Sequence, residues 1–201
     1  DIGLARKIAA PRFVAHHDLE QLVHRRGEAP GGEVHLREFE ARIEVALVGG
    51  QRSVQSIGRT CTAVRLALRR DPVAERVEAR IARLLSWPVI NGEGLQVLHY
   101  LPGAEYQPHH DYFDPAKSGT VPIVARGGQR VATIVMYLNS PDKGGGTTFP
   151  DVGVEVGPVK GNAVFFSYDR PHPSTKTLHG GAPVIAGEKW VATKWLRERE
   201  F

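Results

Sequence analysis

The spacing of the apolar side chains changes at Leu95, and this change limits the folds that the chain can adopt. Over residues 95–100, 130–138, 163–168 and 189–196, apolar and polar side chains alternate with a period of two. This period is typical of β-strands, because successive side chains point to opposite faces of a sheet. Turns that contain Gly and Pro separate the segments, without helical patterns between them. Many short strands of this kind predict an antiparallel barrel or jelly roll.

The residues before Leu95 follow a helical pattern. Asp71 and Pro72 supply an N-cap and a proline at the first helical position. One apolar stripe follows and ends before Pro88; it consists of Val73, Val77, Ile81, Leu84 and Leu85. We expect this helix to pack on the sheet, and we expect another helix over residues 38–46.

The predicted architecture is α+β, mainly β, in a single domain over residues 1–201. A double-stranded β-helix occupies residues 91–199, and a helical, variable part over residues 1–90 supports it. A chain of 201 residues is long enough to bury one substantial core.

Composition excludes some functions and suggests a compartment. The net charge is +4, but basic residues are scattered among acidic ones rather than gathered in a stripe, so we expect no nucleic acid partner. We also expect no membrane segment, because no stretch approaches the roughly 20 apolar residues of a membrane helix. The single Cys61 cannot form an internal disulfide, and a free thiol persists most easily in the reducing cytoplasm.

His109 and Asp111 are the first candidate metal ligands. If residues 108–113 are extended, both side chains leave the same face of the strand, and His110 points away. One imidazole and one carboxylate need a second, distant histidine to complete the 2-His-1-carboxylate triad, which leaves open positions on Fe(II).

Two later histidines can complete this triad. His172 lies between Pro171 and Pro173, a setting suited to a turn, whereas His179 leads through Gly180 and Gly181 towards the last strand. A ligand at the end of a strand faces the interior of a barrel, so we favour His179.

Residues 100–113, with the sequence YLPGAEYQPHHDYF, resemble the iron-binding segment of prolyl 4-hydroxylases. The resemblance continues through RVAT at residues 130–133, GGGTTFP at residues 144–150, and residues 179–195 with GEKW and KW. It covers roughly residues 71–197. It implies a double-stranded β-helix, the cosubstrates 2-oxoglutarate and O2, and ascorbate as the reductant that keeps iron ferrous.

Within this resemblance, three residues are expected to bind 2-oxoglutarate. Lys189 would pair with the distal carboxylate, Tyr100 matches the family tyrosine whose hydroxyl reaches the same cosubstrate, and Thr147 matches the threonine of the family's turn. The parity of the last strand gives an independent check. Lys189 and Trp195 share one face, and Lys194 lies on the other.

Five residues align with positions that line the peptide-substrate groove in the family. They are Tyr106, Glu93, Arg130, Trp195 and Arg59. The chain departs from the family pattern at Cys61, where serine is usual, and at Gly146, where glutamate is usual.

The resemblance implies an Fe(II)- and 2-oxoglutarate-dependent dioxygenase that hydroxylates a prolyl residue in a protein or peptide. The first alternative keeps the iron but has a free amino acid or a small metabolite as the substrate. The second is a non-catalytic, cupin-like metal-binding protein. A zinc hydrolase is disfavoured, because it would require a nearby general base and has no use for Lys189.

Overall fold

The computed structural model describes residues 14–16, 62–65 and 72–201. The helix expected over residues 38–46 and the N-cap expected at Asp71 lie outside these ranges, as do Arg59 and Cys61. Among the described residues, no helix has both the length and the apolar character needed to cross a membrane.

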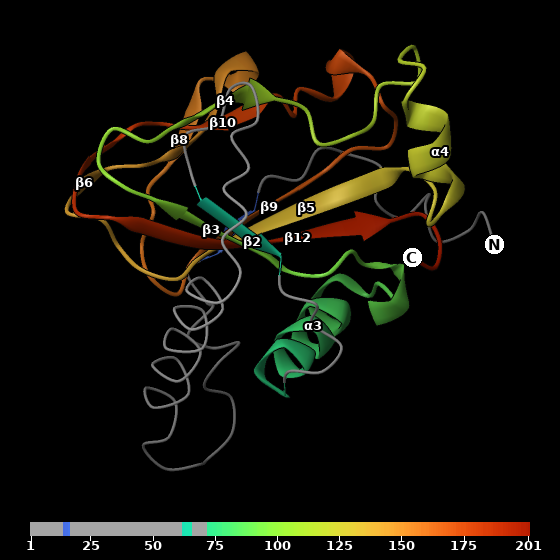
Figure 1. The fold of residues 1–201 in the computed structure, drawn as a ribbon, viewed down its shortest axis with the longest axis horizontal. Coiled ribbons are helices and arrows are strands. Elements are labelled where there is room, and N and C mark those ends of the chain that lie inside the picture. Colours follow the sequence, from blue (N-terminus) through green and yellow to red (C-terminus); the bar gives the residue numbers. More distant parts are fainter. Residues whose placement is uncertain (1–13, 17–61, 66–71) are drawn as a thin grey trace.

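A six-stranded antiparallel sheet runs through the middle of the molecule (Figure 1), with the strand order β1-β9-β5-β12-β3-β2. Its strands are β1 (Val14–His16), β2 (Thr62–Arg65), β3 (Gln96–Tyr100), β5 (Arg130–Tyr137), β9 (Ala163–Ser167) and β12 (Lys189–Arg197). The central strand β12 pairs with β5 on one side and with β3 on the other. All four segments expected to be strands from their period of two belong to this sheet.

A second sheet faces the first and has the order β4-β10-β7-β8. Its strands are β4 (Tyr106–His109), β7 (Thr147–Phe149), β8 (Val154–Val156) and β10 (His179–Gly181). A small third sheet pairs β6 (Lys143–Gly144) with β11 (Val184–Ala186). Two facing antiparallel sheets confirm the predicted jelly roll.

Alternate residues of the six-stranded sheet form two separate cores. Leu98, Val135 and Val191 point towards the second sheet and pack in one cluster with Phe149 of β7. Their neighbours in the sequence point the other way, into a cluster on the outer face of the sheet that includes Ala192. These strands therefore contribute alternate side chains to two cores, one on each face of the sheet.

Helix α3 (Pro72–Leu85) covers the outer face of the six-stranded sheet (Figure 1). Of the expected apolar stripe, Ile81 is buried in the outer cluster, and Val73, Val77 and Leu85 pack against it. Leu84 is an exception, because 49 % of its surface is exposed. The helix ends where Ser86 adopts a left-handed conformation (φ 51°) and the Trp87 amide bonds the Ala82 carbonyl, a Schellman arrangement.

Two local features differ from expectation. The strand expected to continue to Phe113 ends at His109, and Asp111 lies in a bend after it. A short helix, α4 (Thr120–Ala125), lies between β4 and β5, where we expected no helix. Three 3-10 turns, at Val89–Asn91, Pro150–Val152 and Pro173–Thr175, complete the described elements.

A buried ion pair joins helix α3 to the sheet. Lys194, on the outward face of β12, donates a hydrogen bond to Glu78, and their side chains are only 3 % and 6 % exposed. The position of Lys194 confirms the predicted parity of the last strand. Gly92 leaves room for this lysine, because a Cβ at that position would lie 2.5 Å from the Lys194 Cε atom.

We predict that Glu78→Ala or Lys194→Ala lowers the free energy of unfolding by about 3–5 kcal/mol, because each leaves one buried charge without its partner. The double variant Glu78→Leu/Lys194→Met should recover most of that loss, since it buries no charge. Urea unfolding measures both effects. Single-variant losses below about 1 kcal/mol, the value of an exposed pair, would show that this pair does not hold the helix on the sheet.

Candidate metal centre

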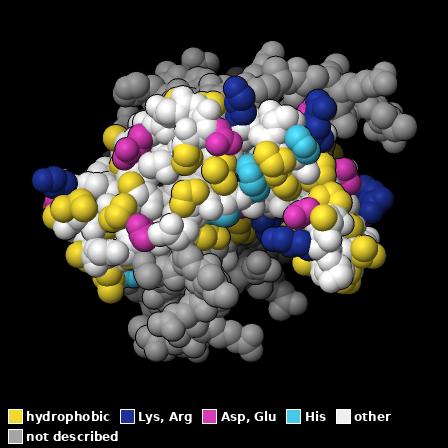
Figure 2. Space-filling view, turned by 90° about the horizontal axis from the view of Figure 1, so that it is seen from above, with side chains coloured by type: hydrophobic (Ala, Val, Ile, Leu, Met, Phe, Trp, Pro, Cys, Tyr) yellow, Lys and Arg dark blue, Asp and Glu magenta, His cyan; other side chains and the backbone are white. Residues whose placement is uncertain are grey.

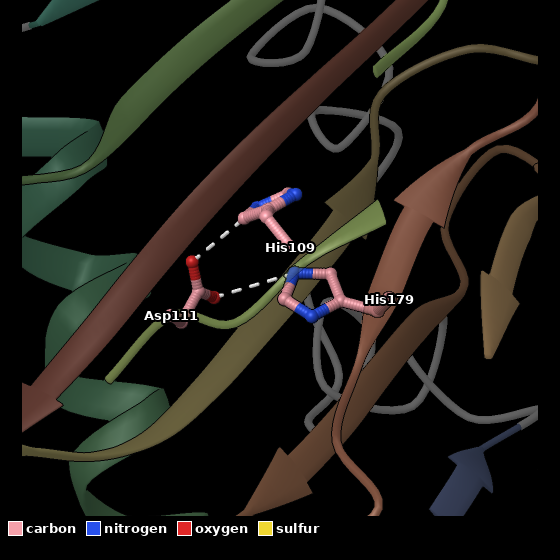
Figure 3. A group of neighbouring side chains, drawn as sticks. All are labelled: His109, Asp111 and His179. Carbon is pink, nitrogen blue, oxygen red and sulfur yellow. Dashed lines mark ion pairs between the residues drawn. The ribbon is translucent and has the colours of Figure 1, made fainter. Parts of the chain in front are cut away.

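The pairing of β4 with β10 sets two histidines side by side. His109 ends β4, His179 begins β10, and the two residues are direct partners in the antiparallel register. Their ring centroids are 4.4 Å apart. Figure 3 shows the two rings, which come from neighbouring strands, on the same side of the Asp111 carboxylate, and a dashed line joins each ring to that carboxylate.

Asp111 completes the cluster from the bend that follows β4. The Nε2 atom of His109 lies 3.6 Å from Asp111 Oδ1, and the Nε2 atom of His179 lies 3.5 Å from Asp111 Oδ2. One ligand atom from each of the three residues lies within 4.8 Å of the others. His110 contributes no atom to this group, and its ring stacks on Tyr112 instead.

Both histidines present the same nitrogen to the cluster. The Nδ1 atom of His109 lies 2.9 Å from the Gln107 carbonyl, and that of His179 lies 3.0 Å from the Thr177 carbonyl. A carbonyl can only accept, so each Nδ1 carries the proton and each Nε2 keeps its lone pair for a metal. Tyr106 stacks on the His109 ring at 3.9 Å between centroids, which further fixes its orientation.

The electrostatics of the cluster favour metal binding. Burial alone would raise the pKa of Asp111, but the nearby His179, His109 and Arg130 outweigh it and hold that pKa well below its usual value. Burial lowers the pKa of His179, although the charge of Asp111 opposes this shift. An ionised carboxylate and a neutral imidazole are the states that bind a divalent metal.

Side chains of β5, and of the residue directly before it, hold the bend around Asp111. The Thr133 hydroxyl donates to Asp111 Oδ2 at 2.7 Å, and Arg130 Nη1 donates to the Asp111 carbonyl at 3.2 Å. The side-chain amide of Gln129 holds the backbone of the next turn. Its oxygen accepts a hydrogen bond from the Phe113 N–H at 2.7 Å, and its nitrogen donates one to the Phe113 carbonyl at 2.8 Å. The bend therefore has fixed partners although it belongs to no sheet.

The three residues lie in a pocket between the two sheets. The pocket is also lined by Tyr100, Tyr106, Thr147, Lys189, Thr193 and Trp195, with Leu98, Val135 and Val191 as its apolar wall. Figure 2 shows the face above the second sheet, where histidine side chains reach the surface among hydrophobic ones, with most basic side chains towards the edges.

Lys189 is buried in this pocket together with the other two residues expected to bind 2-oxoglutarate. Its side chain is 4 % exposed, and its Nζ atom lies 5.3 Å from the centroid of the Tyr100 ring, its partner across β3 and β12. Thr147 accepts a hydrogen bond of 2.7 Å from Tyr137, whose pKa burial raises to about 12. The pocket thus contains a buried cation and several hydroxyl groups.

The residues expected to line a substrate groove divide into two groups. Tyr106 and Trp195 line the pocket. Glu93 and Arg130 are not among the residues that line it, and their place in a substrate groove stays a prediction. Arg130 lies against the face of the Trp195 ring, 4.0 Å from its centroid, and pairs with Glu93 at 2.7 and 3.0 Å.

Glu93 is only 5 % exposed and also accepts a hydrogen bond from the buried Arg197 at 3.2 Å. The sequence motif places Glu93 and Arg130 near the pocket, but it does not reveal that their charges neutralise each other. Arg130 therefore contacts both Asp111 and Trp195, and Glu93 neutralises its charge.

Sequence reasoning assigned no role to Thr133 or Thr193, although both are close to the site. Thr193 lies between Lys189 and Trp195 on the inward face of β12, so the same parity argument identifies it. Thr133 has the parity of Val135, a pocket residue, and pairs with Trp195 across β5 and β12. For both residues, the sequence signal was a hydroxyl side chain at a strand position that faces the pocket.

The donor set fits Fe(II), and the pocket fits a dicarboxylate beside it. Two imidazoles and one carboxylate on one side of an ion leave positions open for other ligands. Lys189, in the same pocket, supplies the charge that a distal carboxylate requires. His172 takes no part, because it precedes the turn Pro173–Thr175 and its Nδ1 accepts from the Ser174 amide at 3.1 Å.

Comparison with known sequences agrees with this donor set. The family model described as the 2OG-Fe(II) oxygenase superfamily matches residues 95–197. Probable prolyl 4-hydroxylase 8 of Arabidopsis thaliana is 40 % identical over 171 residues, which cover 75 % of this chain and 57 % of the plant protein. Prolyl 4-hydroxylase 5 of the same plant is 40 % identical over 164 residues, or 71 % and 55 % of the two chains. The chain thus spans little more than half the length of these relatives.

Solved structures support the fold. The viral collagen prolyl hydroxylase of Paramecium bursaria Chlorella virus-1, in its 2OG complex, superposes with a TM-score of 0.63 at 29 % identity, covering 81 % of this chain and 90 % of the viral one. A prolyl-4-hydroxylase of Pseudomonas putida superposes with a TM-score of 0.63 at 18 % identity, over 98 % of each chain. At 18 % identity, the likeness to the Pseudomonas putida enzyme is evidence for the fold alone.

We predict that His109→Ala, Asp111→Ala and His179→Ala each remove most of the affinity for a divalent metal and leave the fold intact. Each loses one metal ligand, and none of the three is a large apolar core residue. Titration of the metal-free protein with Fe(II) without oxygen, alongside circular dichroism, measures both properties. His172→Ala is the control and should bind metal normally; metal loss in this variant with retention in His179→Ala would reverse the choice of ligand.

Proposed function

Because the chain belongs to the 2OG-Fe(II) oxygenase superfamily, we propose that it is an Fe(II)- and 2-oxoglutarate-dependent dioxygenase that hydroxylates a prolyl residue in a protein or peptide. The observation that carries this proposal is a single pocket with two parts. It contains the His109, Asp111 and His179 cluster, and it also contains the buried cation Lys189.

In this proposal, His109, Asp111 and His179 hold the iron, and Lys189 pairs with the distal carboxylate of 2-oxoglutarate. When bound, the iron and 2-oxoglutarate supply the oxidation: O2 converts 2-oxoglutarate into succinate and CO2, and one oxygen atom enters a C–H bond of the substrate. No acid-base side chain is required for that chemistry. The work of the chain is to bind, orient and exclude water.

Burial explains how Lys189 can select a dicarboxylate. A lysine with 4 % exposure carries a charge that water stabilises poorly, so a carboxylate that reaches it gains a strong charge-assisted hydrogen bond. Tyr100 lies beside it, and Thr147 has its hydroxyl engaged by Tyr137. These groups offer polar contacts while Leu98, Val135 and Val191 keep the pocket otherwise apolar.

Tyr106 and Trp195 support a prolyl substrate. Both aromatic rings line the pocket that contains the metal cluster, and aromatic faces pack well against a saturated pyrrolidine ring. Tyr106 is held by its stacking on His109, and Trp195 by Arg130 over its ring. The names of the plant and viral relatives, all prolyl hydroxylases, agree with this substrate class.

We predict that Lys189→Ala raises the 2-oxoglutarate concentration needed for half-maximal turnover by roughly 10- to 100-fold. This follows from the loss of a charge-assisted contact worth about 1.5–3 kcal/mol, at tenfold for each ~1.4 kcal/mol. Lys189→Arg should be milder, because the charge remains although the planar fork fits differently. Titration of 2-oxoglutarate in a succinate-release assay measures both changes.

Iron affinity should be nearly unchanged in Lys189→Ala, which separates this variant from those of the metal ligands. Lys143→Ala is the matched control, because Lys143 is an exposed lysine on β6 outside the pocket. Equal 2-oxoglutarate requirements for wild type and Lys189→Ala would mean that another cation binds the distal carboxylate.

We predict succinate release coupled to hydroxylation when Fe(II), 2-oxoglutarate and ascorbate are supplied with proline-containing peptides. Mass spectrometry should find one added oxygen on a prolyl residue. Coupled turnover with free proline, and none with any peptide, would move the substrate to the free amino acid. Complete absence of 2-oxoglutarate turnover in a protein that binds iron would instead favour a non-catalytic metal-binding protein.

A further inference from the structure

We propose that the buried hydroxyls of Thr133 and Tyr168 form a one-way hydrogen-bond chain that fixes the Asp111 carboxylate for metal binding. Both are positioning residues, since they act through Asp111. The inference rests on the metal centre of the proposed function and does not depend on the identity of the substrate.

The three side chains come from three different parts of the fold. Thr133 is on β5, Tyr168 directly follows β9, and Asp111 is in the bend after β4. The Thr133 hydroxyl lies 2.7 Å from Asp111 Oδ2 and 3.2 Å from the Tyr168 hydroxyl. All three side chains are buried, with 0 % of Thr133 and 3 % of Tyr168 exposed.

The direction of the chain follows from counting protons. A carboxylate that binds a metal has no proton, so it can only accept, and Thr133 must donate its single hydroxyl proton to Asp111. The Thr133 oxygen can then only accept from Tyr168. The phenol therefore donates to the threonine, and the threonine donates to the carboxylate. Polarisation along such a chain strengthens its last bond.

The carboxylate has few other constraints. Asp111 lies beyond the end of β4, so no sheet pairing holds its backbone. Its oxygens lie 3.5 and 3.6 Å from the two histidine Nε2 atoms and 3.9 Å from Arg130 Nη1. Among these described polar contacts to the carboxylate, the 2.7 Å bond from Thr133 is the shortest. Without it, the carboxylate could rotate away from the position that the two imidazoles require.

The end of the chain is itself held in place. The Tyr168 amide donates to the Val131 carbonyl at 2.9 Å, which extends the β5 and β9 pairing to this residue. Its ring meets Tyr112 edge-on at 6.0 Å between centroids and lies 6.5 Å from Phe166. The phenol is thus anchored by backbone and by packing, so its hydroxyl has a defined position from which to direct Thr133.

A purely structural role is the alternative, in which the two hydroxyls only satisfy each other in the core. Ser167 is the matched control for it. Ser167 ends β9, directly before Tyr168; it is 2 % exposed, and its hydroxyl has no hydrogen-bond partner among the described residues. Removing that hydroxyl tests the cost of losing a buried oxygen from the residue next to Tyr168 without breaking the hydrogen-bond chain.

The experiment titrates Co(II) alone into the metal-free full chain, without 2-oxoglutarate or peptide, and follows the visible cobalt spectrum and the binding heat. Thr133→Val should weaken Co(II) binding by about 10- to 100-fold, the usual effect of losing a residue that orients a ligand. Thr133→Ser keeps the hydroxyl and should bind almost as wild type does. Tyr168→Phe should weaken binding by about two- to tenfold, the worth of one neutral hydrogen bond.

The double variant Thr133→Val/Tyr168→Phe should bind Co(II) no more weakly than Thr133→Val, because Tyr168 acts only through Thr133. Ser167→Ala should match wild type. Independent, additive losses in the double variant would overturn the chain, and so would wild-type affinity in Thr133→Val. If Thr133→Val does not fold, unchanged affinity in a folded Tyr168→Phe overturns the proposal.

The controls separate this inference from the function on which it rests. Wild-type protein that fails to bind one Co(II) would remove the metal centre itself. Wild-type binding with unchanged affinity in the Thr133 and Tyr168 variants would remove only the hydrogen-bond chain.

Discussion

The antiparallel pairing of β4 with β10 is the constraint on which the site depends, because it makes His109 and His179 direct neighbours. A one-residue slip in that register would turn one of the two rings to the other face of the sheet. The backbone carbonyls two residues before each histidine then fix the ring tautomer, so strand geometry alone prepares two of the three metal ligands. The third, Asp111, is held differently, by side chains that reach it from the opposite sheet.

Strand β12 connects the chemistry of the pocket to the stability of the fold. Its inward face carries Lys189 and Trp195, and its outward face carries Lys194, which holds helix α3 through Glu78. Arg197, at the end of the strand, contacts the same Glu93 that pairs with Arg130, and Arg130 contacts both Trp195 and Asp111. The Glu93 carboxylate thus pairs with the guanidinium groups of both Arg130 and Arg197. Burying one of these charges alone would be costly, but as pairs they can be buried. Arg130, held in this way, supports both Asp111 and the Trp195 ring.

The sequence allowed the sheet, the facing of β12 and the choice of His179 to be predicted, because a period of two and a strand end are local features. Asp111 joins the predicted cluster, but the strand geometry from which it was predicted is wrong, since it lies in a bend. Glu93 and Arg130 were expected at the substrate groove, but their mutual neutralisation depends on contacts between residues 37 positions apart, which no local pattern encodes. Helix α4 was missed because its six residues are too few to show a helical period.

The central claim is that one pocket joins a metal site to a dicarboxylate site, and calorimetry without oxygen tests it most directly. 2-Oxoglutarate and glutarate are each titrated into metal-free protein and into protein loaded with Mn(II). Glutarate has both carboxylates at the same spacing but lacks the keto oxygen that would face the metal. The account predicts that Mn(II) strengthens the binding of 2-oxoglutarate by at least about tenfold, or ~1.4 kcal/mol, and that of glutarate far less. Equal binding of 2-oxoglutarate with and without the metal would contradict the account, because the metal and the dicarboxylate would then occupy unrelated sites.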